Sequence, residues 1–173
     1  AGKSFVTLAC DALNESVMER ELFGYERGAF PEATDSQSGK LETAHGGTLF
    51  FDEISAFPLR LQARLLRVLQ TKGVQRLGSE VPIPIDVRIV ASSSKDLHDL
   101  IEQKKFRADL FYRLNEYGLH VPSLRERKTD IPYLASRCLM QYNKELDKSI
   151  GGFTPKALDK MMTYNWPGNV GKL

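Results

Sequence analysis

Two adjacent acidic residues follow a short apolar run in the segment TLFFDE. The run from Thr48 to Phe51 predicts a buried strand that ends directly before Asp52 and Glu53. At the carboxyl end of a parallel strand, one acid can hold the water shell of a Mg2+ ion and the next can deprotonate an attacking water. Two acids at a strand end can also simply cap the following turn, so the residues alone leave both interpretations open.

A second segment imitates a phosphate-binding loop, because Gly2-Lys3-Ser4 spells the end of a Walker A motif. Such a loop lies between a strand and a helix, since the amide groups of the loop and of the helix N-terminus hold the phosphate. Here the β-branched, apolar run from Phe5 to Cys10 predicts that a strand follows the motif. We therefore interpret Gly2-Lys3-Ser4 as a turn that leads into a strand.

The composition of the 173 residues bounds the class of protein. An apolar fraction of 42% suffices for a globular core, and a formal net charge of +2 gives no general electrostatic footprint for nucleic acid. Cys10 and Cys138 are far apart, and no Cys/His cluster has the spacing of metal ligands. Because no long apolar run predicts membrane insertion, we expect a cytoplasmic protein with reduced cysteines and no membrane partner.

Strand and helix patterns alternate along most of the chain and predict the elements that position the acids. Strand patterns fall at residues 5–10, 48–51, 81–94 and 118–121, and helix patterns begin near Ser16, Pro58, Asp96, Phe106, Thr129 and Thr154. Residues 23–40, rich in Gly, Ser, Asp and Pro, predict a long exposed loop. The alternation predicts an α/β fold, in which helices flank a parallel sheet on both faces, followed by a small helical subdomain.

Several longer segments occur together in the order that is typical of one protein family. They read ELFGYERGAF, GGTLFFDEI, LQARLLRVLQ, FRADLFYRLN, VPSLRERKTDIP and NWPGNV. With them the chain strongly resembles, over nearly its whole length, the AAA+ domain of the sigma-54-dependent transcription activators, the bacterial enhancer-binding proteins. The resemblance implies a P-loop NTPase-like AAA+ core over residues 1–126 and a partial helical lid over residues 127–173.

The resemblance also implies an activity and the residues that perform it. The family forms ring-shaped oligomers that use ATP and Mg2+ to remodel the RNA polymerase holoenzyme through its sigma factor. By this likeness Asp52 would hold Mg2+ through water and Glu53 would act on the attacking water. Ser93 and Ser94 stand at the nucleotide-sensing position, where the family usually has Thr-Asn.

Two arginines of the segment FRADLFYRLN match those that a subunit donates to the ATP of its neighbour. They are Arg107 and Arg113, six residues apart. A guanidinium suits this role because charge builds on the phosphoryl group during its transfer. Without the resemblance, two arginines on the surface of a helix would be the simpler interpretation.

The family places two further parts outside these residues. Its Walker A motif lies upstream of the strand that begins at Phe5, so we expect it before Ala1 and interpret the chain as a fragment of a longer protein. Contact with DNA belongs to a C-terminal helix-turn-helix that is not among these residues. We therefore expect weak or no ATP binding by the fragment itself.

The chain departs from the family in the loop that contacts sigma-54. The family sequence Gly-Ala-Phe-Thr-Gly-Ala is replaced by Gly28, Ala29, Phe30, Pro31, Glu32 and Ala33. Pro31 removes a hydroxyl and an N–H and fixes φ, and Glu32 adds a charge and loses the conformational freedom of glycine. Ala9 stands where the family usually has an asparagine, and Gly171 where it has an arginine.

These substitutions leave two functional hypotheses, beside a third in which the chain is a degenerate fragment with no activity. In the first, the intact protein is an ATP-binding AAA+ regulator that remodels the sigma-54 holoenzyme. In the second, it is a divergent regulator of the same fold that acts without sigma-54 and has weak or no ATPase activity. Pro31 and Glu32 are the residues that distinguish the two.

Overall fold

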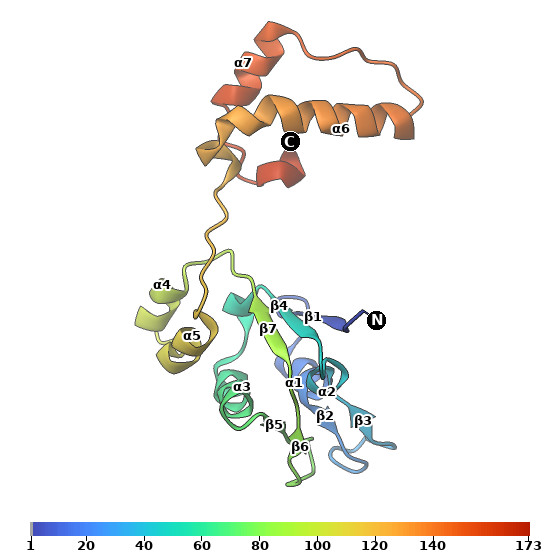
Figure 1. Ribbon diagram of the computed structural model, residues 1–173, viewed down its shortest axis with the longest axis vertical. Coiled ribbons are helices and arrows are strands. Elements are labelled where there is room, and N and C mark those ends of the chain that lie inside the picture. The colour runs from blue at the N-terminus through green and yellow to red at the C-terminus, as the bar shows by residue number, and fades with distance from the viewer. Residues whose placement is uncertain (1) are drawn as a thin grey trace. The chain divides into compact units, whose positions relative to one another are not determined.

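The computed structural model describes residues 2–173 and divides the chain into two units, one up to Gly118 and one from Leu119 (Figure 1). This division lies somewhat earlier in the chain than the boundary expected at residue 126. Among the described residues, none of the helices combines the length and apolar character needed to cross a membrane. Cys10 and Cys138 are free thiols that belong to different units.

A parallel sheet of three strands forms the centre of the first unit. Its strands are β1 (Phe5–Ala9), β4 (Thr48–Asp52) and β7 (Arg88–Ala91), in the order β1-β4-β7. The register pairs Ala9 with Asp52 and Phe51 with Ala91. The carboxyl ends of the three strands therefore meet at one edge, as a parallel sheet requires.

Helices pack on one face of this sheet and enclose the core. They are α1 (Glu15–Phe23), α2 (Lys40–Thr43), α3 (Leu59–Thr71), α4 (Leu97–Glu102) and α5 (Ala108–Leu114). The sheet contributes the fully buried Leu8, Leu49 and Phe51, and the helices contribute Leu65 and Leu110 among others. Burial of each such side chain stabilises the fold by about 1.5–3 kcal/mol. The predicted α/β class, a parallel sheet flanked by helices, is confirmed.

The second face of the sheet, for which the sequence also predicted helices, differs from this expectation. Phe5 is 67% exposed and Val90 is 39% exposed on this face, and the rings of Phe5 and Phe50 stack with centroids 6.2 Å apart. Successive strand residues alternate between faces, and the register puts Asp52 on this face as well. Within residues 2–173 this open face (Phe5, Thr7, Phe50, Arg88 and Val90) carries no helical cover.

Two small antiparallel hairpins extend from the first unit. They are β2 (Gly24–Tyr25) with β3 (Gln37–Ser38), and β5 (Gly73–Val74) with β6 (Ile83–Pro84). The first hairpin closes the segment that the sequence predicted as one long loop. A Cβ atom at Gly24 would lie 2.5 Å from the carbonyl oxygen of Gln37, and Gly24 has a φ of 74°. Only glycine permits this close backbone approach.

Some element boundaries differ from the sequence prediction. Helix α1 starts after Asn14, whose side chain accepts a hydrogen bond from the amide of Val17 at 3.0 Å, so Ser16 is not the cap. The strand predicted at residues 118–121 was wrong, because the segment is irregular and Leu119 is 93% exposed. A strand needs a hydrogen-bonded neighbour, and none of the described residues pairs with this segment.

The second unit is helical, as predicted. It contains η2 (Leu124–Glu126), η3 (Lys128–Asp130), α6 (Ile131–Glu145), α7 (Pro155–Thr163) and η4 (Asn169–Lys172). Helix α6 follows Asp130 rather than Thr129, whereas α7 begins at the predicted cap Thr154. The amide of Leu124 donates to the side chain of Asn169 at 2.8 Å and so joins the two ends of the unit.

Candidate functional site

The acids Asp52 and Glu53 lie at the carboxyl end of β4, as the sequence predicted. The Asp52 side chain is exposed on the open face, and Ser92 directly follows the neighbouring strand β7. Because Phe51 pairs with Ala91, the next residues Asp52 and Ser92 stand side by side on the same face. The Ser92 hydroxyl donates a hydrogen bond to Asp52 Oδ1 at 2.7 Å.

Glu53 adopts a left-handed backbone conformation, with φ 55° and ψ 57°. Such a conformation costs a non-glycine residue about 1–3 kcal/mol and persists only where its surroundings fix it. Here the Glu53 amide donates to Ser92 Oγ at 3.1 Å. The amide of Ser94 donates to both carboxylate oxygens of Glu53 at 3.1 Å, and the Ser55 hydroxyl donates to Oε1.

These contacts decide the protonation of Glu53. Partial burial raises the pKa of the Glu53 carboxyl, but the hydrogen bonds from Ser55 and Ser94 outweigh burial and lower this pKa below its ordinary value. Glu53 is therefore ionised at neutral pH. An ionised carboxylate at this position can accept a proton from a water molecule.

The two serines predicted at the nucleotide-sensing position have different surroundings. The Ser93 hydroxyl donates to the carbonyl oxygen of Lys95 at 2.7 Å and accepts from the Lys95 amide at 3.2 Å, so it closes a local turn. Ser94 contacts Glu53 through its backbone amide. The structure thus brings Ser94, but not the Ser93 hydroxyl, to the acid pair.

Ser92 was not predicted from the sequence as part of this site. Its contact with Asp52 depends on the residue-by-residue register of β4 and β7, which the strand patterns did not fix. The run Ala91 to Ser94 contained the only available signal, three consecutive serines after a strand.

Residues of β1 complete the neighbourhood of Asp52. Ala9 pairs with Asp52, and its methyl group offers no hydrogen bond to either acid. The Cys10 amide donates to the carbonyl oxygen of Asp52 at 2.9 Å. Burial, followed by the negative charges of Asp11, Asp52 and Glu53, raises the pKa of the Cys10 thiol to about 12, so this thiol is neutral and inert.

The predicted arginines both lie on or beside α5 with half-exposed side chains. Arg107 precedes the helix, and its guanidinium binds Asp109 at 3.0 and 2.7 Å. Arg113 is in the last turn, and its Nη1 is 3.4 Å from Glu116 Oε1. The side chains are 40% and 48% exposed, so each can exchange a surface carboxylate for another anion.

A buried glutamine fixes the backbone from which Arg107 projects. Gln62 of α3 is fully buried, and its Nε2 donates to the carbonyl oxygens of Phe57 at 2.7 Å and Lys105 at 3.1 Å. Its Oε1 accepts from the Arg107 amide at 2.8 Å. Gln62 was not predicted from the sequence as part of the site, since a polar side chain in an amphipathic helix is expected to be exposed.

The loop that differs from the family sequence, residues 28–33, forms a turn and packs against neighbouring side chains. The Ala33 amide donates to the Phe30 carbonyl at 2.9 Å, which makes Pro31 the second residue of a β-turn, where proline is favoured. The Phe30 ring lies 3.7 Å from the guanidinium carbon of Arg20 and makes an edge-on contact with Tyr25 at 4.9 Å. Phe30 is therefore half-buried, while Pro31 and Glu32 are exposed.

Arg76, next to β5, holds the base of this loop. Its guanidinium binds Glu42 at 2.8 and 2.6 Å, Glu26 at 3.1 Å and the Ser38 hydroxyl at 3.1 Å. The hydrogen bond from Arg76 is the main cause that lowers the pKa of Glu42. The two hairpins are thus tied together by one half-buried arginine.

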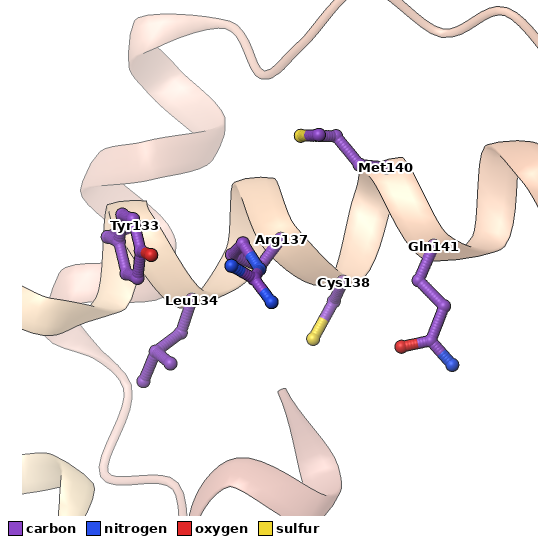
Figure 2. A pocket seen from close by; sticks show the side chains of 6 residues that line it. All are labelled: Tyr133, Leu134, Arg137, Cys138, Met140 and Gln141. Carbon is purple, nitrogen blue, oxygen red and sulfur yellow. The ribbon is translucent and has the colours of Figure 1, made fainter.

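Two hollows mark the surface of the described residues. The larger, of about 610 Å3, lies along α6 in the second unit and is lined by Tyr133, Leu134, Arg137, Cys138, Met140 and Gln141 (Figure 2). The smaller, of about 430 Å3, lies in the first unit between α4 and the segment before α5. Ser55 lines this smaller hollow and also bonds Glu53, so the hollow adjoins the acid pair.

The carboxylates fit one kind of metal site. Among residues 2–173 no cluster of three or more His, Cys, Asp or Glu side chains is arranged to enclose an ion. Mg2+ does not need such a cage, because it keeps several waters and binds through one or two carboxylates and substrate phosphates. The exposed carboxylate of Asp52, held at one oxygen by Ser92, suits that kind of contact.

A parallel sheet that ends in an acid pair, followed by a small helical unit, defines the chain as an AAA+ domain. The chain belongs to the Sigma-54 interaction domain family, which it matches over residues 1–120, and residues 125–173 match the AAA+ ATPase lid domain. The family resemblance stated from the sequence motifs is thereby confirmed.

The curated relatives that this chain matches include transcriptional regulators. ZraR, a transcriptional regulatory protein of Escherichia coli K12, is 47% identical over 171 residues, which are 99% of this chain and 39% of ZraR. AlgB, the alginate biosynthesis transcriptional regulatory protein of Pseudomonas putida, is 46% identical over 173 residues, which are all of this chain and 39% of AlgB. The chain thus spans about two fifths of these relatives.

Solved structures show the same fold. Crystal structures of NtrX from Brucella abortus superpose with a TM-score of 0.87 at 34% identity and cover 98% of this chain and 38% of NtrX. NtrX was also crystallised with ADP and with ATP, with TM-scores of 0.87 and 0.86.

Proposed function

We propose that this chain is part of the ATP-hydrolysing domain of a transcription activator that acts on the sigma-54 holoenzyme. The observation that carries the proposal is the hydrogen-bonded group of Asp52, Ser92 and Glu53 at the carboxyl end of β4. The match to the Sigma-54 interaction domain and the crystallisation of the relative NtrX with ATP support it.

Each acid has its own role in this proposal. Asp52 would hold Mg2+ through water, and the ion would neutralise charge that develops on the phosphates. Glu53 orients the attacking water and accepts its proton, because its carboxylate is ionised and fixed by Ser94 and Ser55. The Ser94 amide holds the Glu53 carboxylate at both of its oxygens.

The arginines complete the site across a subunit boundary. We propose that the protein self-associates into a ring and that Arg107 and Arg113 reach the phosphates of the neighbour's nucleotide. Both side chains are half-exposed, and their present partners Asp109 and Glu116 are surface carboxylates. Such surface pairs are worth at most about 1 kcal/mol, so the guanidinium groups can leave them at little cost.

The test uses the full-length protein that contains this chain. We expect Glu53→Gln to lower ATP turnover about 10²–10⁴-fold while ATP binding stays within a few-fold, because the amide keeps the shape but accepts no proton. Glu102→Gln, at an exposed position of α4, is the matched control and should leave turnover unchanged. Unchanged turnover in Glu53→Gln would show that Glu53 only caps a turn and does not accept the proton of the water.

A second function is favoured by the loop at Pro31, namely regulation without sigma-54. The turn from Phe30 to Ala33 and the contact of Phe30 with Arg20 hold the loop in a compact form. Under this alternative the loop does not reach the sigma factor, and ATPase activity is weak or absent. The stiff backbone at Pro31 and the exposed charge of Glu32 both oppose a grip on sigma-54.

In vitro transcription distinguishes the two functions. The full-length protein is tested with ATP, RNA polymerase and a sigma-54 promoter, beside the double variant Pro31→Thr with Glu32→Gly. Robust open-complex formation by the unmodified protein would support the sigma-54 function. Activation by the double variant alone would support the alternative for the natural protein.

A further inference from the structure

A single hydroxyl group joins the two acids of the candidate site. Ser92 Oγ donates its proton to Asp52 Oδ1 at 2.7 Å and accepts the amide proton of Glu53 at 3.1 Å. A serine hydroxyl has one proton to donate, so this proton is committed to Asp52. The side chain of one residue therefore touches the carboxylate of the first acid and the backbone of the second.

The backbone of Ser92 is held on both sides, which makes the hydroxyl a fixed point. The Ser92 amide donates to the carbonyl oxygen of Phe51 at 2.9 Å, and its own carbonyl oxygen accepts from the amide of Ile54 at 2.8 Å. Both partners flank the acid pair in the sequence. The side chain and the main chain of Ser92 thus both form hydrogen bonds to the segment that contains Asp52 and Glu53.

The two acids need this support for different reasons. Asp52 is exposed, and in residues 2–173 its carboxylate receives no side-chain hydrogen bond other than that from Ser92. Without it the carboxylate can turn about its side-chain torsions, each of which has several staggered or broad minima. Glu53 is in the left-handed region, where the hydrogen bond that its amide donates to Ser92 Oγ offsets part of the conformational cost.

We propose that Ser92 is a positioning residue that orients the Asp52 carboxylate for Mg2+-nucleotide and fixes the Glu53 turn. The bond to Oδ1 leaves Oδ2 without a hydrogen-bond partner in residues 2–173, so this oxygen is available to a water of the ion. Groups that orient metal-binding carboxylates typically contribute 10- to 100-fold to metal affinity or activity. The inference rests on the proposed function, because it concerns the same site.

The test compares variants of the full-length protein that differ only in the hydroxyl. Ser92→Thr keeps the hydroxyl, and Ser92→Val has nearly the shape of threonine without it. We expect Ser92→Val and Ser92→Ala to lower kcat about 10- to 100-fold and to raise the Mg2+ concentration needed for half-maximal turnover. KM for ATP should change less than kcat, and Ser92→Thr should retain activity within about threefold.

A second readout does not depend on hydrolysis. A fluorescent ATP analogue is titrated with and without Mg2+. The increase in affinity for the analogue that Mg2+ causes, called the tightening, is compared among the variants. We expect Ser92→Val to lose this tightening and Ser92→Thr to keep it, with similar melting temperatures for the two. If Thr and Val are equally impaired, or if Val behaves as the unmodified protein, the positioning role is overturned.

The two readouts separate this inference from the proposed function. An unmodified protein that binds ATP but does not hydrolyse it would overturn the proposed ATPase, while the Mg2+-dependent tightening would still decide the role of Ser92. A protein that binds no nucleotide would overturn both. Ser136→Ala is the control, because Ser136 is exposed on α6 and its hydroxyl donates only to the carbonyl oxygen of Pro132, and it should leave the Mg2+ dependence unchanged.

Discussion

Single residues near the acid pair owe their properties to the charges and the burial that surround them. Glu53 is partly buried but remains ionised, because hydrogen bonds to its carboxylate outweigh desolvation. The nearby Cys10 has the opposite outcome, since burial in the core, followed by the charges of Asp11, Asp52 and Glu53, raises the pKa of its thiol. Both residues directly follow strands of the parallel sheet. The site therefore favours the negative charge of the Glu53 carboxylate and disfavours that of a Cys10 thiolate.

Cys10 makes stability depend on pH in the alkaline range. Its pKa is about 12 in the folded protein against 9.0 ordinarily, so the thiol is neutral in both states below pH 9. Above pH 9 only the unfolded thiol ionises, and the free energy of unfolding should fall by about 1.4 kcal/mol per pH unit until the folded thiol also ionises. Urea unfolding measured between pH 8 and pH 10.5 checks this slope.

The contribution of Cys10 to this slope is isolated by comparing two variants. Cys10→Ala should flatten the slope, whereas Cys138→Ala in the other unit should retain it. Equal slopes in the unmodified protein and in Cys10→Ala would show that the thiol does not titrate as the structure implies.

At the scale of elements, the hairpins and helices of the first unit are joined by a few polar side chains that reach backbone groups. Arg76 ties the two hairpins, and Gln62 ties α3 to the segment that leads into α5. Such contacts satisfy backbone groups that no helix or strand satisfies. They determine where the loop at Phe30 and the arginine at position 107 are presented.

Replacement of the buried glutamine should destabilise the first unit. Gln62→Met keeps the volume but leaves the Phe57 and Lys105 carbonyls and the Arg107 amide without this partner. Each unsatisfied buried group costs about 1–3 kcal/mol, so we expect the three groups together to lower the free energy of unfolding, measured in urea, by at least about 3 kcal/mol. Gln70→Met, at an exposed position of the same helix, is the control and should be nearly neutral.

A small effect of Gln62→Met would contradict this account. A loss below about 0.5 kcal/mol, the range of ordinary surface substitutions, would mean that water replaces the glutamine at no cost.

At the scale of the whole molecule, the acid pair and the two arginines of the candidate site all belong to the first unit. Asp52 is exposed at the carboxyl edge of the sheet, beside an open face that carries Phe5 and Val90. Gly2-Lys3-Ser4 runs directly into β1, and the carbonyl of Ser4 accepts from the Thr48 amide at 2.8 Å. This segment is therefore a strand entry and not a phosphate-binding loop, as the sequence predicted.

Residues 1–173 by themselves should bind ATP weakly or not at all. Within residues 2–173 no glycine-rich loop precedes a helix N-terminus in the way that phosphate binding requires. Isothermal titration of these residues with Mg2+-ATP, beside the full-length protein, measures the difference. Micromolar affinity of the 173 residues would reveal a phosphate site elsewhere.

If a ring forms, Arg113 should act on the nucleotide of a neighbouring subunit. Arginines donated in this way increase turnover about 10³–10⁵-fold in other phosphoryl-transfer systems. Mixing full-length Arg113→Ala with Glu53→Gln should restore some turnover, because part of the interfaces then combine an intact Glu53 with an intact Arg113. Arg67→Ala, at an exposed position of α3, serves as the control. It should hydrolyse ATP without being mixed with a second variant.

Light scattering shows whether both variants still assemble. If they do, and no mixture exceeds the parent variants, Arg113 does not act in trans.

The sequence by itself determined the class of fold, the position of the acids and the family. Hydrophobic runs and turn residues are local signals, so TLFF before Asp52 and Thr154 before Pro155 were sufficient to place a strand and a helix. The sequence did not foresee the contacts of Ser92 and Gln62, because each joins residues about 40 positions apart. Only the register of parallel strands and the packing of α3 bring such residues together.

The same reason explains the strand that did not form at residues 118–121. Its apolar residues carry the local pattern of a strand, but a strand forms only where a second segment offers its hydrogen-bonding groups. Likewise the turn at Pro31 was visible as a stiff backbone, whereas the docking of Phe30 on Arg20 required α1 to lie beneath it. Strand patterns and turn residues can be recognised in the sequence, because they depend on neighbouring residues. Contacts between residues that are distant in sequence are determined by the tertiary structure.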